Sequence, residues 1–185
     1  MELQTERLIL RAWQEDDAES LYKYAKNPNI RSIAGWQPHT SVEYSRDIIK
    51  NVLSEDNTYA VTLKKTGEAI GSIGLMLSQS KIHSAEIAKD EGEIGYWIGE
   101  PFWGQGLIPE AVRELLRHGF EDLNLSTIWC GYYDGNEKSK RAQEKCGFIY
   151  HHTEYNKQVP LMNEIRTEHF THILRENWKK SQKLQ

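Results

Sequence analysis

The stretch that decides the fold reads Ile98-Gly99-Glu100-Pro101-Phe102-Trp103-Gly104-Gln105-Gly106-Leu107-Ile108-Pro109-Glu110. It joins a short apolar run, typical of a strand, to a segment whose apolar residues recur at helical spacing. The first N–H groups of a helix have no partner within the helix, and the helix dipole favours negative charge there. Gly104 and Gly106 lack the side chains that would keep a phosphate away from the backbone. The stretch therefore predicts a strand–loop–helix unit suited to binding an anion.

Two common phosphate-binding motifs do not fit this spacing. A dinucleotide fingerprint counted from Gly104 requires glycine at its sixth position, which Pro109 occupies. A P-loop requires Lys and then Ser or Thr directly after its last glycine, and the loop has neither. Taken alone, the two glycines are also consistent with a tight turn between a strand and a helix.

Outward from the loop, apolar runs and helical patterns alternate along the chain. We expect a mixed sheet of about seven strands flanked by about four helices, an α/β (α+β mixed) fold. The expected strands are 8–13, 59–63, 69–77, 94–99, 127–133, 148–155 and 165–173, and the expected helices are 18–25, 41–53, 108–120 and 137–145. Asn27-Pro28 is expected to end the first helix, because the residue before proline disfavours helical geometry. The segment 165–178 is also compatible with a helix.

Composition sets the broad class of protein. A chain of 185 residues suits one domain, and we expect that domain to span residues 1–178, followed by a polar tail at 179–185. The hydrophobic content of 38% and charged content of 27% are typical of a globular protein. A formal net charge of −4 argues against a nucleic-acid partner, because neutralising phosphates requires a basic surface. We see no secretory signal, no apolar run that would span a membrane and no Cys-x-x-Cys pair, so we expect a cytoplasmic protein with reduced thiols.

Three motifs in order carry a resemblance to a known family. They are Thr5-Glu6-Arg7-Leu8-Ile9-Leu10-Arg11, then Glu93–Ile98 with Phe102–Leu107 and Glu110-Ala111, and finally Asn136-x-x-Ser139 with Glu144-Lys145-Cys146-Gly147-Phe148. With these motifs the chain resembles the GNAT superfamily, in particular the branch of ribosomal-protein N-terminal (alanine/serine) acetyltransferases. The resemblance runs from about Thr5 to about Trp178. It departs at Trp103, where Arg or Gln is usual, at Ile108, where a small residue is usual, and at Gln143, where many members carry a Tyr that protonates the leaving thiolate.

The resemblance implies the GNAT fold, with a twisted and mostly antiparallel sheet, and acetyl-CoA as co-substrate. The implied reaction is direct attack of a primary amine on the thioester, the amine belonging to a small molecule or to a protein N-terminus. The protein is expected to be a monomer or a homodimer, with no membrane partner. The alternative is a catalytically weak acyl-CoA-binding or regulatory domain of the same fold.

The resemblance also assigns roles to residues of this chain. Glu93 is the expected base, the alternative being an exposed carboxylate at a strand end. Ser139 is the expected donor to the departing sulfur, the alternative being a polar residue in the first turn of a helix. The backbone groups of Ile98 and Gly99 should contact the pantetheine arm, with Asn136 as a further contact and helix cap. The amides of the loop should hold the pyrophosphate, and these belong to Trp103, Gly104, Gln105, Gly106, Leu107 and Ile108.

Several other side chains allow a functional or a structural interpretation. Lys138, Lys140, Arg141 and Lys145 make one short helix basic, so one of them, Arg141 foremost, is expected at the coenzyme's 3′-phosphate; the alternative is a solvated face. The acidic segment 83–93, with Glu86, Asp90 and Glu91, would favour a cationic acceptor if it borders the acceptor pocket. Cys130 lies in an apolar strand and is expected to be inert. We expect no metal site, since His151 and His152 are neighbours on a strand and should point to opposite sides.

Overall fold

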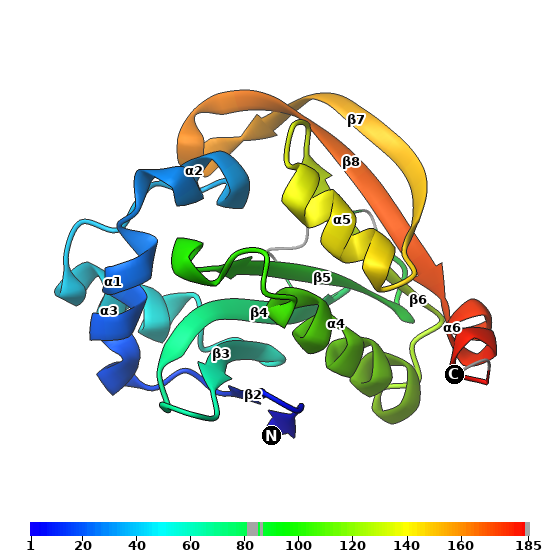
Figure 1. The fold of residues 1–185 in the computed structure, drawn as a ribbon. Helices are drawn as coiled ribbons and strands as arrows, with labels where there is room; N and C mark the ends of the chain where they lie inside the picture. The colour runs from blue at the N-terminus through cyan, green and yellow to red at the C-terminus, as the bar shows by residue number, and fades with distance from the viewer. Residues whose placement is uncertain (81–84, 86, 184–185) are drawn as a thin grey trace.

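A computed structural model describes residues 1–80, 85 and 87–183 (Figure 1). In this part of the chain an eight-stranded sheet is accompanied by six α-helices. The strands are β1 (Leu3–Gln4), β2 (Leu8–Arg11), β3 (Thr58–Leu63), β4 (Ala69–Leu77), β5 (Glu91–Ile98), β6 (Thr127–Tyr133), β7 (Ile149–Val159) and β8 (Glu164–Leu174). The helices are α1 (Ala18–Ala25), α2 (Pro28–Ala34), α3 (Val42–Asn51), α4 (Leu107–Arg117), α5 (Glu137–Lys145) and α6 (Arg175–Gln182). No helix of the described residues is both long enough and apolar enough to cross a bilayer.

The sheet has the strand order β1-β2-β3-β4-β5-β6-β8-β7. Neighbouring strands are antiparallel except β5 and β6, which run parallel. These two strands pair at only four positions, from Glu91 with Thr127 to Ile94 with Cys130. Beyond that point β5 continues to Ile98 and β6 to Tyr133 without pairing to each other, so the sheet is open between them.

Helix α4 forms where the sequence predicts it, because its apolar residues lie on one buried face. Leu107, Ile108, Ala111, Val112, Leu115 and Leu116 are all buried. Pro109 lies in the first turn, where its missing N–H removes no hydrogen bond. The helix continues into one π-helical turn, His118–Asp122, so its predicted end at Phe120 falls within that turn. Helices α4 and α5 lie side by side over one face of the sheet (Figure 1).

The predicted mixed, mostly antiparallel fold is confirmed, and two elements, β1 and α2, were missing from the expectation. Leu3 and Gln4 pair with β2 and add the short strand β1. Pro28 both follows the end of α1 and opens α2, because the Asn27 side chain accepts a hydrogen bond from the Asn29 amide and caps the new helix. The segment 165–178 is strand as far as Leu174 and helix from Arg175, so both interpretations of it were correct for different parts.

Strand β7 departs from regular alternation at its N-terminal end. Tyr150 pairs with Thr171 and His152 pairs with Phe170, which leaves His151 as an extra residue in a β-bulge. The bulge brings Nδ1 of His151 and Nδ1 of His152 to 2.8 Å from each other, so the expectation that the two rings point to opposite sides was wrong. No group of three or more metal-binding side chains with suitable geometry lies among the described residues.

Candidate active site

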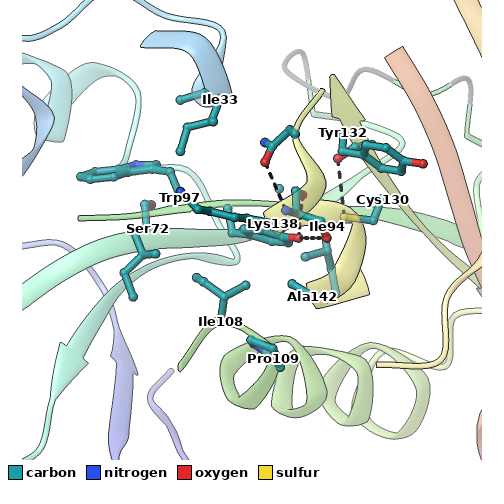
Figure 2. A pocket seen from close by; sticks show the side chains of 18 of the residues that line it. Ile33, Ser72, Ile94, Trp97, Ile108, Pro109, Cys130, Tyr132, Lys138 and Ala142 are labelled. Carbon is teal, nitrogen blue, oxygen red and sulfur yellow. Dashed lines mark hydrogen bonds between the residues drawn. The ribbon is translucent and has the colours of Figure 1, made fainter. Parts of the chain in front are cut away.

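The functional site is a cavity of about 700 Å³ that opens where β5 and β6 separate (Figure 2). Its lining residues come from strands β3, β4, β5, β6 and β8, from helices α2, α4 and α5, and from the segments that follow α2 and α3 and precede α4 and α5. Because alternate residues of a strand point to opposite faces, a cavity at this opening is accessible from both faces of the sheet. Figure 2 shows Trp97 and Ser72 together on one side, apart from Ile108 and Pro109 of α4 and Ala142 of α5.

One half of the cavity lies against α4 and α5 and contains the loop predicted to bind an anion. Gly104 and Gly106 both have positive φ, 76° and 75°, which side chains disfavour. No atom lies within 4 Å of the place a β-carbon would take at Gly104, so this position is open. Within the described chain, the amides of Gly104, Gln105 and Gly106 donate no hydrogen bond to a protein acceptor. This loop and the following helix N-terminus therefore fit a diphosphate.

The N-terminal motif that begins at Thr5 contacts this loop and the first turn of α4. Nε of Arg7 lies 2.6 Å from Oε2 of Glu110, in the first turn of α4. Arg7 Nη1 donates to the Gln105 carbonyl at 3.0 Å, and the Thr5 hydroxyl donates to Glu110 Oε1 at 2.5 Å. Together these contacts hold the loop between β5 and α4 against the start of β2.

Helix α5 brings basic side chains to the same half of the cavity. Lys138, Arg141 and Lys145 line the cavity, whereas Lys140 does not. Nζ of Lys138 lies 3.8 Å from the ring centroid of Trp103, a cation–π contact that ties α5 to the loop. The Trp103 indole N–H donates to the Ile98 carbonyl at 2.8 Å, which fixes the ring at the end of β5.

Ser139 is part of a hydrogen-bonded chain that reaches from β5 to β8. Its Oγ lies 2.8 Å from the phenol oxygen of Tyr96 and accepts a hydrogen bond of 3.1 Å from Gln143 Nε2. Gln143 also donates to the Gly131 carbonyl at 3.0 Å and accepts from the Thr171 hydroxyl at 2.7 Å. The side chain of Asn136 accepts from the Ser139 amide and caps α5 as predicted.

The sequence analysis did not single out Tyr96, although it lies inside the quoted stretch Glu93–Ile98. Burial raises the pKa of the Tyr96 phenol, which keeps the group protonated and able to donate. Strand alternation could have indicated it, because Ile94, Tyr96 and Ile98 lie on the same face of the sheet. On this face Tyr96 contacts Ser139 of α5.

The other half of the cavity lies on the opposite face of the sheet and contains Glu93. This carboxylate is only 3% exposed, and its Oε2 accepts a hydrogen bond from the Ala85 amide at 2.8 Å. The alternative of an exposed strand-end carboxylate was therefore wrong about its exposure. Glu168 of β8, which the sequence analysis also missed, is 6% exposed and lines this half too.

The rest of the acidic segment lies elsewhere or outside the described residues. Glu91 accepts hydrogen bonds from the Trp129 indole and the Ala88 amide, and neither it nor Asp90 lines the cavity. Residues 83 and 86 lie outside the described residues. Cys130 does line the cavity, but burial raises the pKa of its thiol well above the usual range, so it is neutral as expected of an inert cysteine.

The structure brings most of the predicted site residues to this one cavity. Those that line it are Glu93, Ile98, Trp103, Gly104, Gly106, Leu107, Ile108, Asn136, Ser139 and Arg141. Gly99 and Gln105 are not among them. The Gly99 amide donates to the Ile70 carbonyl at 2.8 Å, and the Gln105 side chain donates to the Pro101 carbonyl at 2.8 Å.

Comparisons with known proteins agree with this geometry. The family model of the acetyltransferase (GNAT) domain matches residues 7–149. The chain is 36% identical over 132 residues to an uncharacterized N-acetyltransferase, p20, of Bacillus licheniformis, a match that covers 68% of this chain and 70% of the relative.

Solved structures share the fold. A ribosomal-protein-S5-alanine acetyltransferase of Vibrio fischeri superposes with a TM-score of 0.72 at 20% identity, covering 96% of this chain and 98% of the other. A spermidine N-acetyltransferase of Vibrio cholerae, solved in complex with CoA and spermine, superposes with a TM-score of 0.73 at 20% identity, covering 94% and 98%.

Proposed function

The chain belongs to the GNAT acetyltransferase family and is an acetyl-CoA-dependent N-acetyltransferase, and from this premise we propose that it acetylates a primary amine by direct attack on the thioester. The observation that carries the proposal is one cavity between β5 and β6, with the loop of Gly104 and Gly106 and Ser139 on one face and a buried carboxylate on the other. We place this activity in residues 1–178.

Acetyl-CoA supplies the acetyl group as a thioester: the acceptor nitrogen forms a bond to the acetyl carbon and the carbon–sulfur bond breaks. For the reaction to balance, the nitrogen loses a proton and the sulfur gains one. In the proposal, the amides around Gly104 and Gly106 hold the diphosphate, and Lys138, Arg141 and Lys145 supply positive charge beside it.

Ser139 is the proposed donor at the leaving sulfur. A hydroxyl group has one hydrogen to donate and two lone pairs to accept with. Gln143 donates to Ser139 Oγ, and the protonated Tyr96 phenol is placed to donate to the same atom. When both lone pairs are used in this way, the Ser139 hydrogen is left to point at a ligand. Tyr96 and Gln143 therefore act as positioning residues for Ser139.

Glu93 is the proposed base. It is buried on the acceptor face and separated from the cationic side chains of α5 by the sheet, so it can take the proton that the amine releases. Replacing Glu93 by Gln removes the proton acceptor with little change in shape, and we expect kcat/KM to fall by about 100-fold. Glu93→Gln enzyme with wild-type kcat/KM across the pH range would remove this assignment.

The acceptor is best identified by measuring thiol release from acetyl-CoA in the presence of different amines. The names of the two solved structures make peptide N-termini and polyamines the first acceptors to test. Mass spectrometry of an N-acetylated product, together with amine-dependent release of free thiol, is the expected result. Binding of coenzyme A with no turnover of any amine would favour the alternative of a binding or regulatory domain.

A further inference from the structure

The half of the cavity on the Glu93 face of the sheet, which we call the acceptor half, holds two buried carboxylates. Glu93 and Glu168 come from strands on either side of β6, and both line the cavity. Tyr133 pairs with Glu168, and Trp129 pairs with both Glu93 and His172, so alternation places Glu93 and Glu168 on the same face of the sheet. Burial raises the pKa of Glu168, the hydrogen bond and charge of Lys157 oppose that rise, and the charge on Glu93 adds to it.

The local structure makes room for Glu168 at the cavity. A β-carbon at position 131 would lie 2.6 Å from Glu168 Oε1, so a larger residue there would displace the carboxylate from this position. Nζ of Lys157 lies 2.9 Å from the other oxygen, Oε2, and 2.8 Å from Oε2 of Glu154. One lysine is thus shared between two carboxylates, and it does not line the cavity.

The cationic residues that do line the cavity are on its other side. Lys138, Arg141 and Lys145 all belong to α5, on the face that holds the coenzyme loop. Arg166 lies 4.8 Å from the Tyr133 ring, but its Nη2 is paired with Glu164 at 2.7 Å. Among the residues that the structure describes, a ligand in the acceptor half therefore faces two carboxylates, while Lys157 and Arg166 are already ion-paired.

Apart from Ser72 and Thr58, the remaining wall of this half is apolar and aromatic. Trp36 and Trp97 pack edge to face with ring centroids 5.5 Å apart. Gly35 ends α2 in the left-handed conformation, and a β-carbon there would lie 2.6 Å from the Tyr133 hydroxyl, so α2 rests closely on β6. The other apolar lining residues from this side are Ile33, Ala34, Leu53 and Met76.

Resting on the proposed function, we propose that the acceptor is a primary amine that carries an apolar or aromatic group and no carboxylate on the carbon next to nitrogen, and that Glu168 is the specificity-determining residue. The ammonium form is attracted by Glu93 and Glu168, and the apolar group packs on Trp36, Trp97 and Tyr133. A free α-amino acid would bring its own carboxylate next to the two carboxylates of the protein, and the described residues that line this half include no cation to meet it.

Phenethylamine and L-phenylalanine test this inference, because they differ only in the α-carboxylate, and phenylalanine amide restores a neutral group at that position. We expect kcat/KM for thiol release to be at least about tenfold higher with phenethylamine and with the amide than with phenylalanine. In Glu168→Gln this preference should shrink by about threefold or more. Glu154→Gln is the matched control, since it removes a carboxylate that shares Lys157 but does not line the cavity, and it should keep the wild-type preference.

The outcomes separate this inference from the function on which it rests. Equal kcat/KM for phenylalanine and phenethylamine would overturn the proposed acceptor class while leaving amine acetylation intact. An unchanged preference in Glu168→Gln, with coenzyme A bound as by the wild type, would overturn the role of Glu168. No thiol release with any amine would instead overturn the proposed function.

Discussion

The phenol oxygen of Tyr96 on β5 lies 2.8 Å from the hydroxyl oxygen of Ser139 on α5. The contact joins β5 to α5 beside the cavity that both residues line. It gives this chain a tyrosine hydroxyl beside Ser139, although Gln143 occupies the position where many family members carry a tyrosine.

Replacing Ser139 by Ala is expected to lower kcat by about 100-fold, because it removes the proposed donor to the developing charge on sulfur. Replacing Tyr96 by Phe should lower kcat only about fivefold, since it removes one hydrogen bond that orients Ser139. Steady-state kinetics with acetyl-CoA should show little change in the KM for acetyl-CoA in either variant. A Tyr96→Phe enzyme with a raised KM and unaltered kcat would contradict the positioning role.

Replacing Arg7 by Ala should weaken coenzyme binding although Arg7 does not line the cavity. Arg7 holds the Gln105 carbonyl and Glu110, so its loss frees the loop that we propose binds the diphosphate. We expect the KM for acetyl-CoA to rise about fivefold, with kcat nearly unchanged. Arg117→Ala is the control, because Arg117 is also ion-paired on α4 but lies at the opposite end of the helix, and its KM should match the wild type.

Charge reversal on α5 tests where the coenzyme's 3′-phosphate binds. Arg141 lines the cavity and the neighbouring Lys140 does not. Arg141→Glu should raise the KM for acetyl-CoA about tenfold, and Lys140→Glu should have a small effect. The difference between the variants should disappear with 3′-dephospho-acetyl-CoA. If both variants keep the wild-type KM, the basic face of α5 is only solvated.

His39 makes folding stability depend on pH. It packs between Trp36 and Tyr44, with Nδ1 2.8 Å from the Ser45 hydroxyl, and burial lowers its pKa from 6.5 to about 4. Above pH 6.5 the residue is neutral in both states; between pH 6.5 and 4 only the unfolded chain takes up the proton, so the folded state loses stability as the pH falls.

Urea denaturation at several pH values measures this effect. The midpoint of the wild type should fall more steeply between pH 6.5 and 4 than that of His39→Gln. The exposed His151→Gln variant should follow the wild type. Parallel curves for wild type and His39→Gln would show that His39 does not carry the dependence.

Local signals explain why parts of the fold were predictable. Strand β6 and helix α5 have the predicted bounds, since Asn136 caps α5 through the Ser139 amide and Gly147 follows its end with a positive φ of 88°. The loop before α4 was also predictable, because its glycines and the helix start are contiguous in sequence.

Features that depend on distant segments were not predictable in the same way. The bulge at His151 depends on pairing with β8, and the Tyr96–Ser139 contact joins residues 43 positions apart in the sequence. Glu168 reaches the cavity because β8 lies next to β6 and Gly131 leaves space for the carboxylate. The strand order cannot be read from the spacing of residues in the sequence, so Glu168 could not be assigned to the site before the sheet was known.

Calorimetric titration of the purified protein with coenzyme A tests most directly whether the amides between Gly104 and Ile108 hold a diphosphate. The wild type should bind one coenzyme A per chain, and 3′-dephospho-coenzyme A should still bind because it keeps the diphosphate. Gly104→Val, which places a β-branched side chain where φ is positive, should abolish or strongly weaken binding of both. Wild-type protein that binds neither compound would contradict the account.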